Sequence, residues 1–205
     1  MALRIEMFSD FVCPFCYIGF EVMRRLKPEF DLDLQWRGFQ IHPDWPPEGI
    51  SAEDALAGSS ANRRATWNRI ESMANEIGLS IKPPAVFTSS LIALEAAEFA
   101  GELNRGEAVE ERIYRAYFQE GRNIGERTVV LDLCAEAGLD RNALEAALDS
   151  GRYVIKLKNN GLLANQRGVS GVPTFFIGEF QMVGAQSESA MRHLLKRATE
   201  RGIGA

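Results

Sequence analysis

The pair Cys13 and Cys16 constrains this chain more than any other feature. The two cysteines are separated by two residues and stand between an apolar run, 3–8, and a segment of helical periodicity. A Cys-x-x-Cys at a strand-to-helix junction places its first sulfur at the helix N-terminus, where unpaired backbone N–H groups and the positive end of the helix dipole stabilise an anion. Cys13 is therefore predicted to ionise more easily than a free cysteine and to act as the nucleophile in thiol–disulfide exchange. Cys16, one helical turn later, is predicted to resolve the mixed disulfide.

The competing interpretation of the pair is one half of a zinc site. Zinc takes about four protein ligands in a structural site. The remaining candidates are Cys134, His42 and His193, and none of them shows paired spacing. The sequence therefore favours redox chemistry and predicts no metal. Cys134, on a helical face, is expected to pack in a core, and the two histidines are expected to be incidental or at the surface.

Composition restricts the class of protein that carries this pair. The chain has 205 residues, 46% of them apolar, and a formal charge of −5. That is enough for one large domain or a core fold with an insertion, and the acidic balance argues against nucleic acid as a partner. No apolar run of about 18 residues occurs, so no membrane span is expected. Segment 1–8 is too short and too acidic for a secretory leader, and a cytoplasmic location is expected.

Hydropathy patterns predict a β-α-β unit around the cysteine pair. The apolar run 3–8 predicts a strand that is buried on both faces. From Cys13 onward, apolar residues recur at helical spacing until Pro28 interrupts them. Segment 31–37 alternates polar and apolar residues, which predicts a second strand with one face partly exposed. The two strands are expected to be parallel and joined by a right-handed crossover.

The middle of the chain is predicted to be a helical bundle. Three prolines between positions 43 and 47 deny that segment regular structure and place a boundary near residue 50. From about 60 to 168 the sequence is rich in alanine and glutamate and has a helical period. Helices are predicted near 65–77, 91–103, 107–120, 128–137, 140–149 and 151–167.

Strand patterns return near the C-terminus. Segments 174–177 and 180–183 flank a tight turn and predict a hairpin, and Ser187 is positioned to cap a final helix. If the two β-containing ends join in space, they form a four-stranded mixed sheet flanked by helices. The predicted fold class is α/β, with residues 1–50 and 151–205 in one domain and residues 51–150 as an inserted helical domain.

A second motif, Gly171-Val172-Pro173-Thr174, stands directly before the hairpin. Proline at a strand start is either an ordinary entry or a cis residue. A Cys-Pro-x-Cys after the first strand, a helical insertion and a late Val-Pro-Thr together resemble the DsbA-like branch of the thioredoxin superfamily. The stretches 9–19 and 171–176 resemble more closely the FrnE-like cytosolic thiol–disulfide oxidoreductases, and the similarity covers nearly the whole chain.

This resemblance implies a thioredoxin fold that is interrupted by the helical insertion. It also implies that the Val172-Pro173 bond is cis, packs against the dithiol and pairs through its backbone with an extended substrate. Pro14 and Phe15 lie between the cysteines, where residues tune the environment of the sulfurs, and they are expected to contact substrate.

The resemblance leaves the proton carrier of the resolving cysteine open. Many relatives have an acidic residue six positions before the first cysteine, and here that position is Met7. Asp10 and Glu6 are the candidate substitutes, and a water molecule is the third.

The resemblance implies a thiol–disulfide oxidoreductase that reduces or isomerises protein or small-molecule disulfides. No cofactor is expected besides the redox-active disulfide, with glutathione as a candidate thiol. Two alternatives stay open. The 2-hydroxychromene-2-carboxylate isomerases and kappa-class glutathione transferases share the architecture, although they typically place serine where this chain has Cys13. A binding module or holdase would use the bundle as an apolar groove and the dithiol as a redox sensor.

Overall fold

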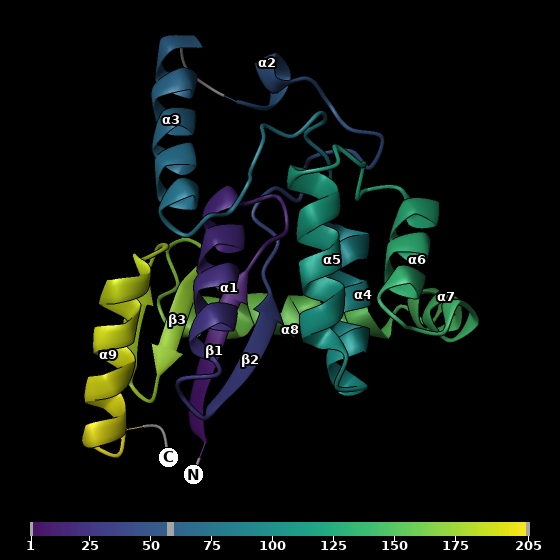
Figure 1. The fold of residues 1–205 in the computed structure, drawn as a ribbon. Helices are drawn as coiled ribbons and strands as arrows, with labels where there is room; N and C mark the ends of the chain where they lie inside the picture. Colours follow the sequence, from purple (N-terminus) through teal and green to yellow (C-terminus); the bar gives the residue numbers. More distant parts are fainter. Residues whose placement is uncertain (1, 57–59, 204–205) are drawn as a thin grey trace.

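The computed structural model describes residues 2–56 and 60–203, which form a mixed sheet with helices on both faces and a group of helices beyond one edge (Figure 1). The strands are β1 (Leu3–Ser9), β2 (Leu32–Gly38), β3 (Thr174–Ile177) and β4 (Phe180–Val183). The helices are α1 (Pro14–Leu26), α2 (Ala52–Ala55), α3 (Ser60–Glu76), α4 (Leu91–Glu102), α5 (Gly106–Phe118), α6 (Arg127–Glu136), α7 (Arg141–Asp149), α8 (Arg152–Gln166) and α9 (Glu188–Glu200).

The predicted four-stranded mixed sheet is confirmed. Its strand order is β2-β1-β3-β4, with β1 parallel to β2 and antiparallel to β3, and β3 antiparallel to β4. The predicted β-α-β unit is therefore β1-α1-β2. The prediction that β1 is buried on both faces is only partly right, because Arg4 is exposed and Glu6 is half-buried on one face, while the other residues of the strand are buried. The end of β1 lies beside the start of β3, where Phe8 pairs with Thr174.

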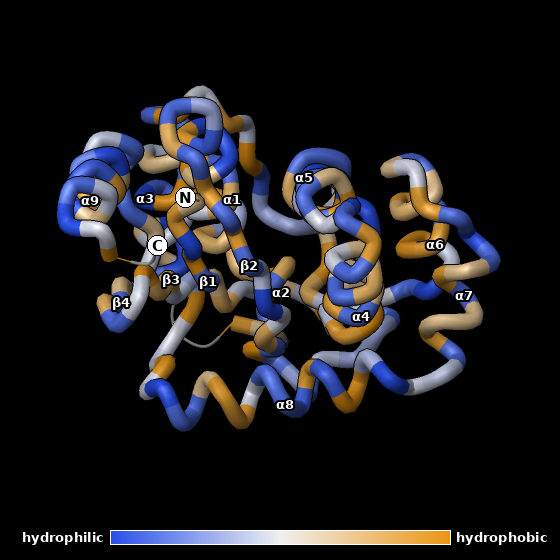
Figure 2. Tube along the Cα trace, turned by 90° about the horizontal axis from the view of Figure 1, so that it is seen from below, coloured by the Kyte–Doolittle hydropathy of each residue, from blue (hydrophilic) through white to orange (hydrophobic). Residues whose placement is uncertain are grey.

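Figure 2 looks along the strands and shows the layers, with α1 and α9 on one face of the sheet and α8 on the other. Strand alternation decides which residue of β1 meets which layer. Ile5 and Met7 join the large core that includes the buried face of α1. Phe8 points to the other face, where it packs with Ala164 of α8 and Phe176. Glu6, in step with Phe8, therefore lies on the α8 face.

The helices between β2 and β3 do not form a single group. Helices α4 to α7 pack against one another beyond the β2 edge, and α8 runs from them across the sheet (Figure 1). Helix α3, which the sequence placed with the bundle, instead packs on α1. It buries only Ile70 and Ala74, so its own sequence says little about its partner.

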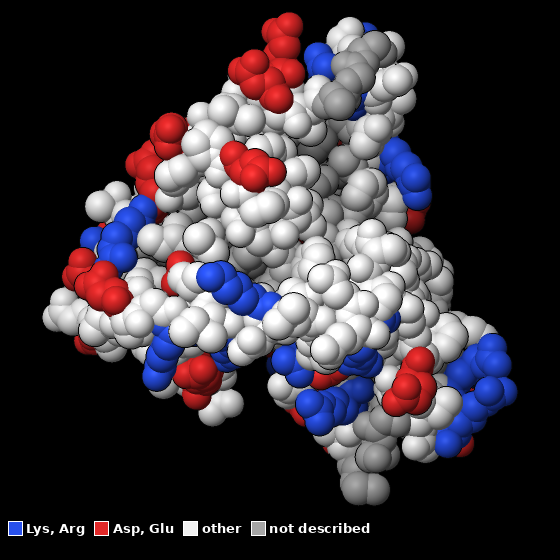
Figure 3. Space-filling model, turned by 180° about the vertical axis from the view of Figure 1, so that it is seen from behind, with Lys and Arg blue, Asp and Glu red and all other residues white. Residues whose placement is uncertain are grey.

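The surface carries charges of both signs. On the face seen in Figure 3, Lys and Arg alternate with Asp and Glu, and no continuous basic stripe crosses it. Within residues 2–56 and 60–203, no helix combines the length and the apolar character that a membrane crossing requires.

Gly19 sets the distance between α1 and β3. A Cβ at this position would lie 3.0 Å from the Phe175 ring and 3.2 Å from the Pro173 side chain. Both contacts are tighter than ordinary van der Waals packing, so a larger residue would push the start of β3 away from α1. Glycine is therefore required here for close approach of two elements rather than for a turn.

We expect Gly19→Ala to destabilise the protein by about 1 kcal/mol, because overpacking costs about 1–3 kcal/mol and the alanine regains at most about 1 kcal/mol of helix propensity. Urea unfolding measures this. The matched control is Gly161→Ala in α8, where an added Cβ meets nothing within 4 Å. That variant should gain about 0.5–1 kcal/mol. Equal stabilisation by both substitutions would contradict this account of the packing.

Candidate active site

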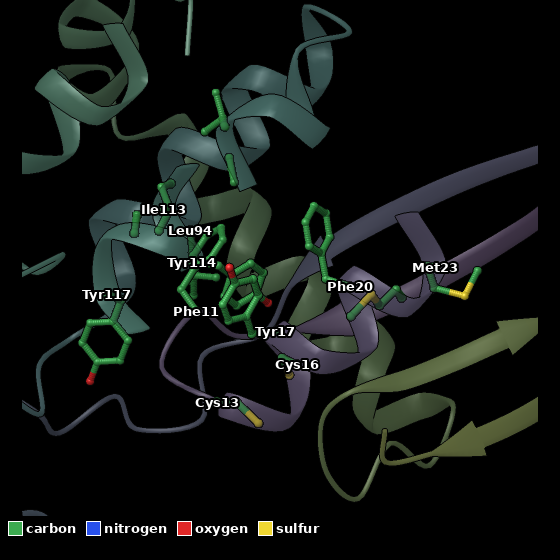
Figure 4. Packing of buried hydrophobic residues seen from close by; sticks show 14 of the residues in the cluster. Phe11, Cys13, Cys16, Tyr17, Phe20, Met23, Leu94, Ile113, Tyr114 and Tyr117 are labelled. Atoms are coloured by element: carbon green, nitrogen blue, oxygen red, sulfur yellow. The ribbon is translucent and has the colours of Figure 1, made fainter. Parts of the chain in front are cut away.

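The cysteine pair lies at the N-terminal end of α1, as the sequence predicts (Figure 4). Cys13 is the N-cap residue, in extended conformation, and Pro14 is the first residue of the helix. Proline loses no hydrogen bond at this position, because a backbone N–H there would have no partner within the helix. The Cys13 carbonyl accepts the N–H groups of Cys16 and Tyr17 at 3.0 and 3.3 Å. Cys13 is 7% exposed and Cys16 is 0% exposed, and both are free thiols. Of the two sulfurs, Cys13 is thus the one that a partner can reach.

The Val172-Pro173 motif lies against the first cysteine. Its peptide bond is cis. The Cys13 thiol donates to the Val172 carbonyl oxygen at 3.6 Å, across 159 positions of sequence. The Thr174 hydroxyl donates to the Gly171 carbonyl at 2.6 Å, which ties down the loop on the other side of Pro173. The structure therefore brings the two sequence motifs into one site.

Cys16 is enclosed below Cys13. Its sulfur accepts the backbone N–H of Asp10 at 3.5 Å. Burial is the main reason that the pKa of Cys16 lies well above its ordinary value, and the hydrogen bond and the charge of Cys13 add to it, whereas the Ser9 hydroxyl acts in the opposite direction. Cys16 is a thiol at neutral pH, so its attack on a mixed disulfide requires a proton acceptor.

Asp10 is fully buried, and its backbone N–H contacts the Cys16 sulfur. Its carboxyl oxygens accept the backbone N–H groups of Val12 at 3.3 Å and Ile41 at 2.7 Å. Burial raises the pKa of Asp10 to about 6, and these hydrogen bonds limit the rise. The residue that contacts the Cys16 sulfur through its backbone thus carries a carboxyl group that changes its protonation state close to neutral pH.

Glu6, the other candidate proton carrier, does not lie at the dithiol. It is on the α8 face of the sheet, where it pairs with Arg37 at 2.6 Å and with Arg167. Burial raises the pKa of Glu6, but the hydrogen bonds from the two arginines outweigh it and leave the pKa below its ordinary value. Met7 is fully buried in the core on the α1 face. The position that is acidic in many relatives is therefore filled here by an apolar side chain.

Two hydroxyl groups lie near Cys16, those of Ser9 and Tyr114, and neither residue was predicted as part of the site. The Ser9 hydroxyl lies 2.7 Å from the hydroxyl of Tyr114, which comes from α5 of the insertion. The Tyr114 ring stacks on Tyr17 with centroids 5.0 Å apart and meets Phe11 edge-on at 4.8 Å (Figure 4). Tyr114 thus connects the helical insertion to Ser9, next to Cys16.

Pro14 and Phe15 are both partly exposed at the mouth of the site. The Arg69 guanidinium of α3 lies 5.8 Å from the centre of the Phe15 ring, close enough for a cation–π contact. Helix α3 therefore borders the surface that a substrate of Cys13 would approach.

The remaining cysteine and histidines lie apart from this arrangement. Cys134 is fully buried in α6, which confirms the prediction that it packs in a core, and burial raises its pKa to about 12. His42 stacks on Trp45 in a loop, with ring centroids 3.7 Å apart. No group of three or more His, Cys, Asp or Glu side chains among the described residues is arranged to hold a metal ion.

Comparison with known proteins agrees with this geometry. The model of the DSBA-like thioredoxin domain family matches residues 4–196. The uncharacterized protein YwbO of Bacillus subtilis is 29% identical over 189 residues, which cover 90% of this chain and 92% of YwbO.

Two solved structures share the fold. A probable DsbA oxidoreductase from Streptomyces coelicolor superposes with a TM-score of 0.85 at 23% identity, over 96% of this chain and 90% of the other. The cytosolic disulfide reductase DsbM from Pseudomonas aeruginosa gives a TM-score of 0.73 at 22% identity, over 97% and 99%, and a second structure of DsbM contains GSH.

The family match spans most of the sequence, including both the Cys13-Cys16 pair and the Val172-Pro173 motif. This chain belongs to the DSBA-like thioredoxin domain family.

Proposed function

We propose that this protein is a thiol–disulfide oxidoreductase that reduces or isomerises disulfides through Cys13 and Cys16. The observation that carries the proposal is the position of the Cys13 sulfur at the start of α1, 3.6 Å from the Val172 carbonyl oxygen, with Cys16 buried one turn behind it. This arrangement offers one reachable nucleophile, a second thiol within reach of it, and a stretch of backbone where a substrate strand would pair.

The reaction follows from the two sulfurs. The Cys13 thiolate attacks one sulfur of a disulfide and forms a mixed disulfide, and the other sulfur leaves as a thiolate. The Cys16 sulfur then loses its proton and attacks Cys13, which releases the second thiol of the substrate. The substrate gains two electrons, and the protein is left with a Cys13-Cys16 disulfide. Two molecules of a small thiol return it to the dithiol and become a disulfide themselves.

We propose that the carboxylate of Asp10 accepts the proton that the Cys16 thiol loses. Asp10 is fully buried, its backbone N–H donates to the Cys16 sulfur, and the pKa of about 6 makes its carboxyl group a base at neutral pH. Glu6 is the weaker candidate, because Arg37 and Arg167 hold it on the opposite face of the sheet. Transfer through a bound water molecule is consistent with this assignment.

The direction and setting of the reaction are part of the proposal. Glutathione is the proposed reductant and the cytoplasm the proposed location, which is supported by the cytosolic reductase DsbM and its structure with GSH. Protein or small-molecule disulfides are the proposed substrates, with Pro14, Phe15, Val172 and Pro173 as the residues that contact them. Nucleic acid is not among the proposed partners.

The direct test measures glutathione-driven reduction of a peptide disulfide. The wild type should accelerate reduction, whereas Cys13→Ser should be no faster than the uncatalysed reaction, because the attacking sulfur is gone. Cys16→Ser should accumulate a mixed disulfide at Cys13 that mass spectrometry detects. The matched control is Cys134→Ser, in a buried thiol of the insertion, which should retain activity. A Cys13→Ser variant as active as wild type contradicts the proposal.

For the proton carrier, we predict that Asp10→Asn slows release of glutathione from the Cys13 mixed disulfide by about 10²-fold or more at pH 7, because a positioned general base typically contributes about 10²–10⁴-fold. In the wild type this rate should fall as pH drops through about 6, because the Asp10 carboxyl group becomes protonated and stops accepting protons. The variant should lack this inflection. Glu6→Gln is the control and should keep the wild-type release rate and its fall near pH 6. If Glu6→Gln lost both and Asp10→Asn kept both, Glu6 rather than Asp10 would be the proton acceptor.

A third prediction concerns the insertion. Tyr114→Phe keeps the stacked ring but removes the hydroxyl that contacts the Ser9 hydroxyl and, at 3.4 Å, the Asp10 carbonyl oxygen, at a cost of about 1 kcal/mol in unfolding free energy. Release from the mixed disulfide should slow by about fivefold, the equivalent of that energy, because Ser9 is then free to turn away from Cys16. Tyr117→Phe likewise removes a tyrosine hydroxyl, which donates to the Val86 carbonyl, and should be destabilised without slowing release. Equal rates for the two variants would rule out a positioning role for Tyr114.

A further inference from the structure

A cavity of about 540 Å³ lies between the free edge of β2 and the helical insertion. Its walls are the second half of α1, strand β2, and the facing sides of α4 and α5. The lining residues of α1 begin at Phe20 and continue to Lys27 beyond its end. Measured from Cys13 along the helix, this is about 10–20 Å from the dithiol, at a rise of 1.5 Å per residue. The cavity is therefore separate from the active site.

At every second residue of β2, the backbone N–H and C=O groups point toward this cavity. The Leu3 N–H donates to the Asp31 carbonyl at 2.7 Å, and the Phe39 N–H donates to the Ser9 carbonyl at 2.9 Å. In a parallel ladder the bonded residues of one strand alternate with residues whose N–H and C=O point the other way. Odd-numbered residues of β2 therefore bond to β1, and even-numbered residues direct their backbone groups to the free edge.

One of the even-numbered residues is already satisfied. The Gly38 N–H donates to Glu98 at 2.8 Å, and its carbonyl accepts the side-chain amide of Asn160 at 3.2 Å. These two bonds occupy the free edge at the C-terminal end of β2. Nearer the start of the strand, no described residue hydrogen-bonds the outward backbone groups of three residues. These are Leu32, Leu34 and Trp36, and all three line the cavity.

Glu110 of α5 faces the same space. It is only 5% exposed, lines the cavity, and makes no hydrogen bond or ion pair with any described residue. Most other charged residues of the lining are paired, such as Lys27 with Glu107 and Lys156 with Glu98. A buried carboxyl group without a partner is costly, and a cation that reaches it gains from the low dielectric of its surroundings.

From these two observations we infer that the cavity binds an extended peptide segment that carries a lysine or arginine side chain. The peptide would add a strand to the free edge of β2, and its cationic group would pair with Glu110. An extended ligand fits because backbone groups of Leu32 to Trp36 repeat along about 13 Å of strand, the length of four extended residues. Opposite them, the small residues Ala97 and Gly101 of α4 leave room for its backbone.

The titration of Glu110 gives the proposal a second signature. The pKa of Glu110 is raised to about 8, mainly by burial and also by the charges of Glu107 on α5 and Glu98 on α4, whereas Lys27 acts in the opposite direction. Below this pH the carboxyl group is neutral and pairs weakly with a cation. Affinity for a lysine-containing peptide should therefore rise as pH increases toward about 8, while the lysine, with a pKa near 10.4, stays charged.

The test uses the wild-type protein and a fluorescein-labelled peptide without cysteine, acetyl-Thr-Val-Lys-Val-Thr-amide, so no disulfide chemistry contributes. At about pH 9, where the Glu110 carboxyl group is ionised and the peptide lysine is still charged, fluorescence polarisation should show saturable binding. Binding should be weaker by at least about tenfold for the Thr-Val-Glu-Val-Thr peptide and for Glu110→Gln, because each removes the charge pair. The pH dependence should vanish in Glu110→Gln. N-methylation of the peptide amides that face β2 should abolish binding without any change to the protein.

Amide hydrogen exchange locates the ligand. Bound peptide should slow exchange at Leu34 and Trp36 and leave Asp33 and Gln35, which already bond to β1, unchanged. Absence of saturable binding overturns the proposal, as does binding that is indifferent to Glu110→Gln and N-methylation, or protection at the Val172-Pro173 loop instead. Protection of Leu34 that grows with protein concentration alone would assign the edge to a second copy of this chain and also overturn it.

Discussion

The close packing of the Val172-Pro173 loop on the first turns of α1 is the contact on which the site depends. It is possible because β1 lies between β2 and β3, so the end of β1, which leads into the cysteines, is beside the start of β3, which follows the proline. Gly19 allows the two elements to approach. The Cys13 sulfur then meets the Val172 carbonyl although the two residues are 159 positions apart.

The helical insertion packs closely at the cysteine end of the sheet and leaves a cavity beside β2 at the other end. At the cysteine end it closes the site from behind, because Tyr114 stacks on Tyr17 and contacts Ser9, and so it encloses Cys16. This burial raises the pKa of Cys16 and so keeps it protonated at neutral pH, which is why the proposed mechanism needs a proton acceptor such as Asp10. At the far end the insertion stands away from β2 and leaves the strand edge and Glu110 facing a cavity. One insertion thus creates a closed site and an open groove.

The sequence predicted the elements well because their signals are local. The apolar run of β1, the alternation of β2 and the helical period from Cys13 all lie within short windows, and the structure confirms the resulting mixed sheet. The contact of Cys13 with the Val172-Pro173 loop was implied by the resemblance alone, and the other side-chain contacts between distant segments were not predicted. The hydroxyl groups of Ser9 and Tyr114 meet although the residues are 105 positions apart, and no sequence pattern around either residue predicts this contact.

The choice between Asp10 and Glu6 shows the same limit. Strand parity places Glu6 on the opposite face from Met7, but parity alone does not say which face α1 covers. Only the packing of Phe8 with Ala164 of α8 settles that Glu6 faces away from the dithiol. Likewise α3 has few apolar residues to bury, and its place beside α1 follows from tertiary contacts rather than from its sequence.

The central claim is that Cys13 and Cys16 act as one redox pair. It is tested most directly by adding one equivalent of glutathione disulfide to the reduced wild-type protein and mapping the products by peptide mass spectrometry. The account predicts a protein lighter by two hydrogen atoms, with a disulfide between Cys13 and Cys16 and an unmodified Cys134. An unchanged protein, or a glutathione adduct on Cys13 that Cys16 never displaces, would contradict it.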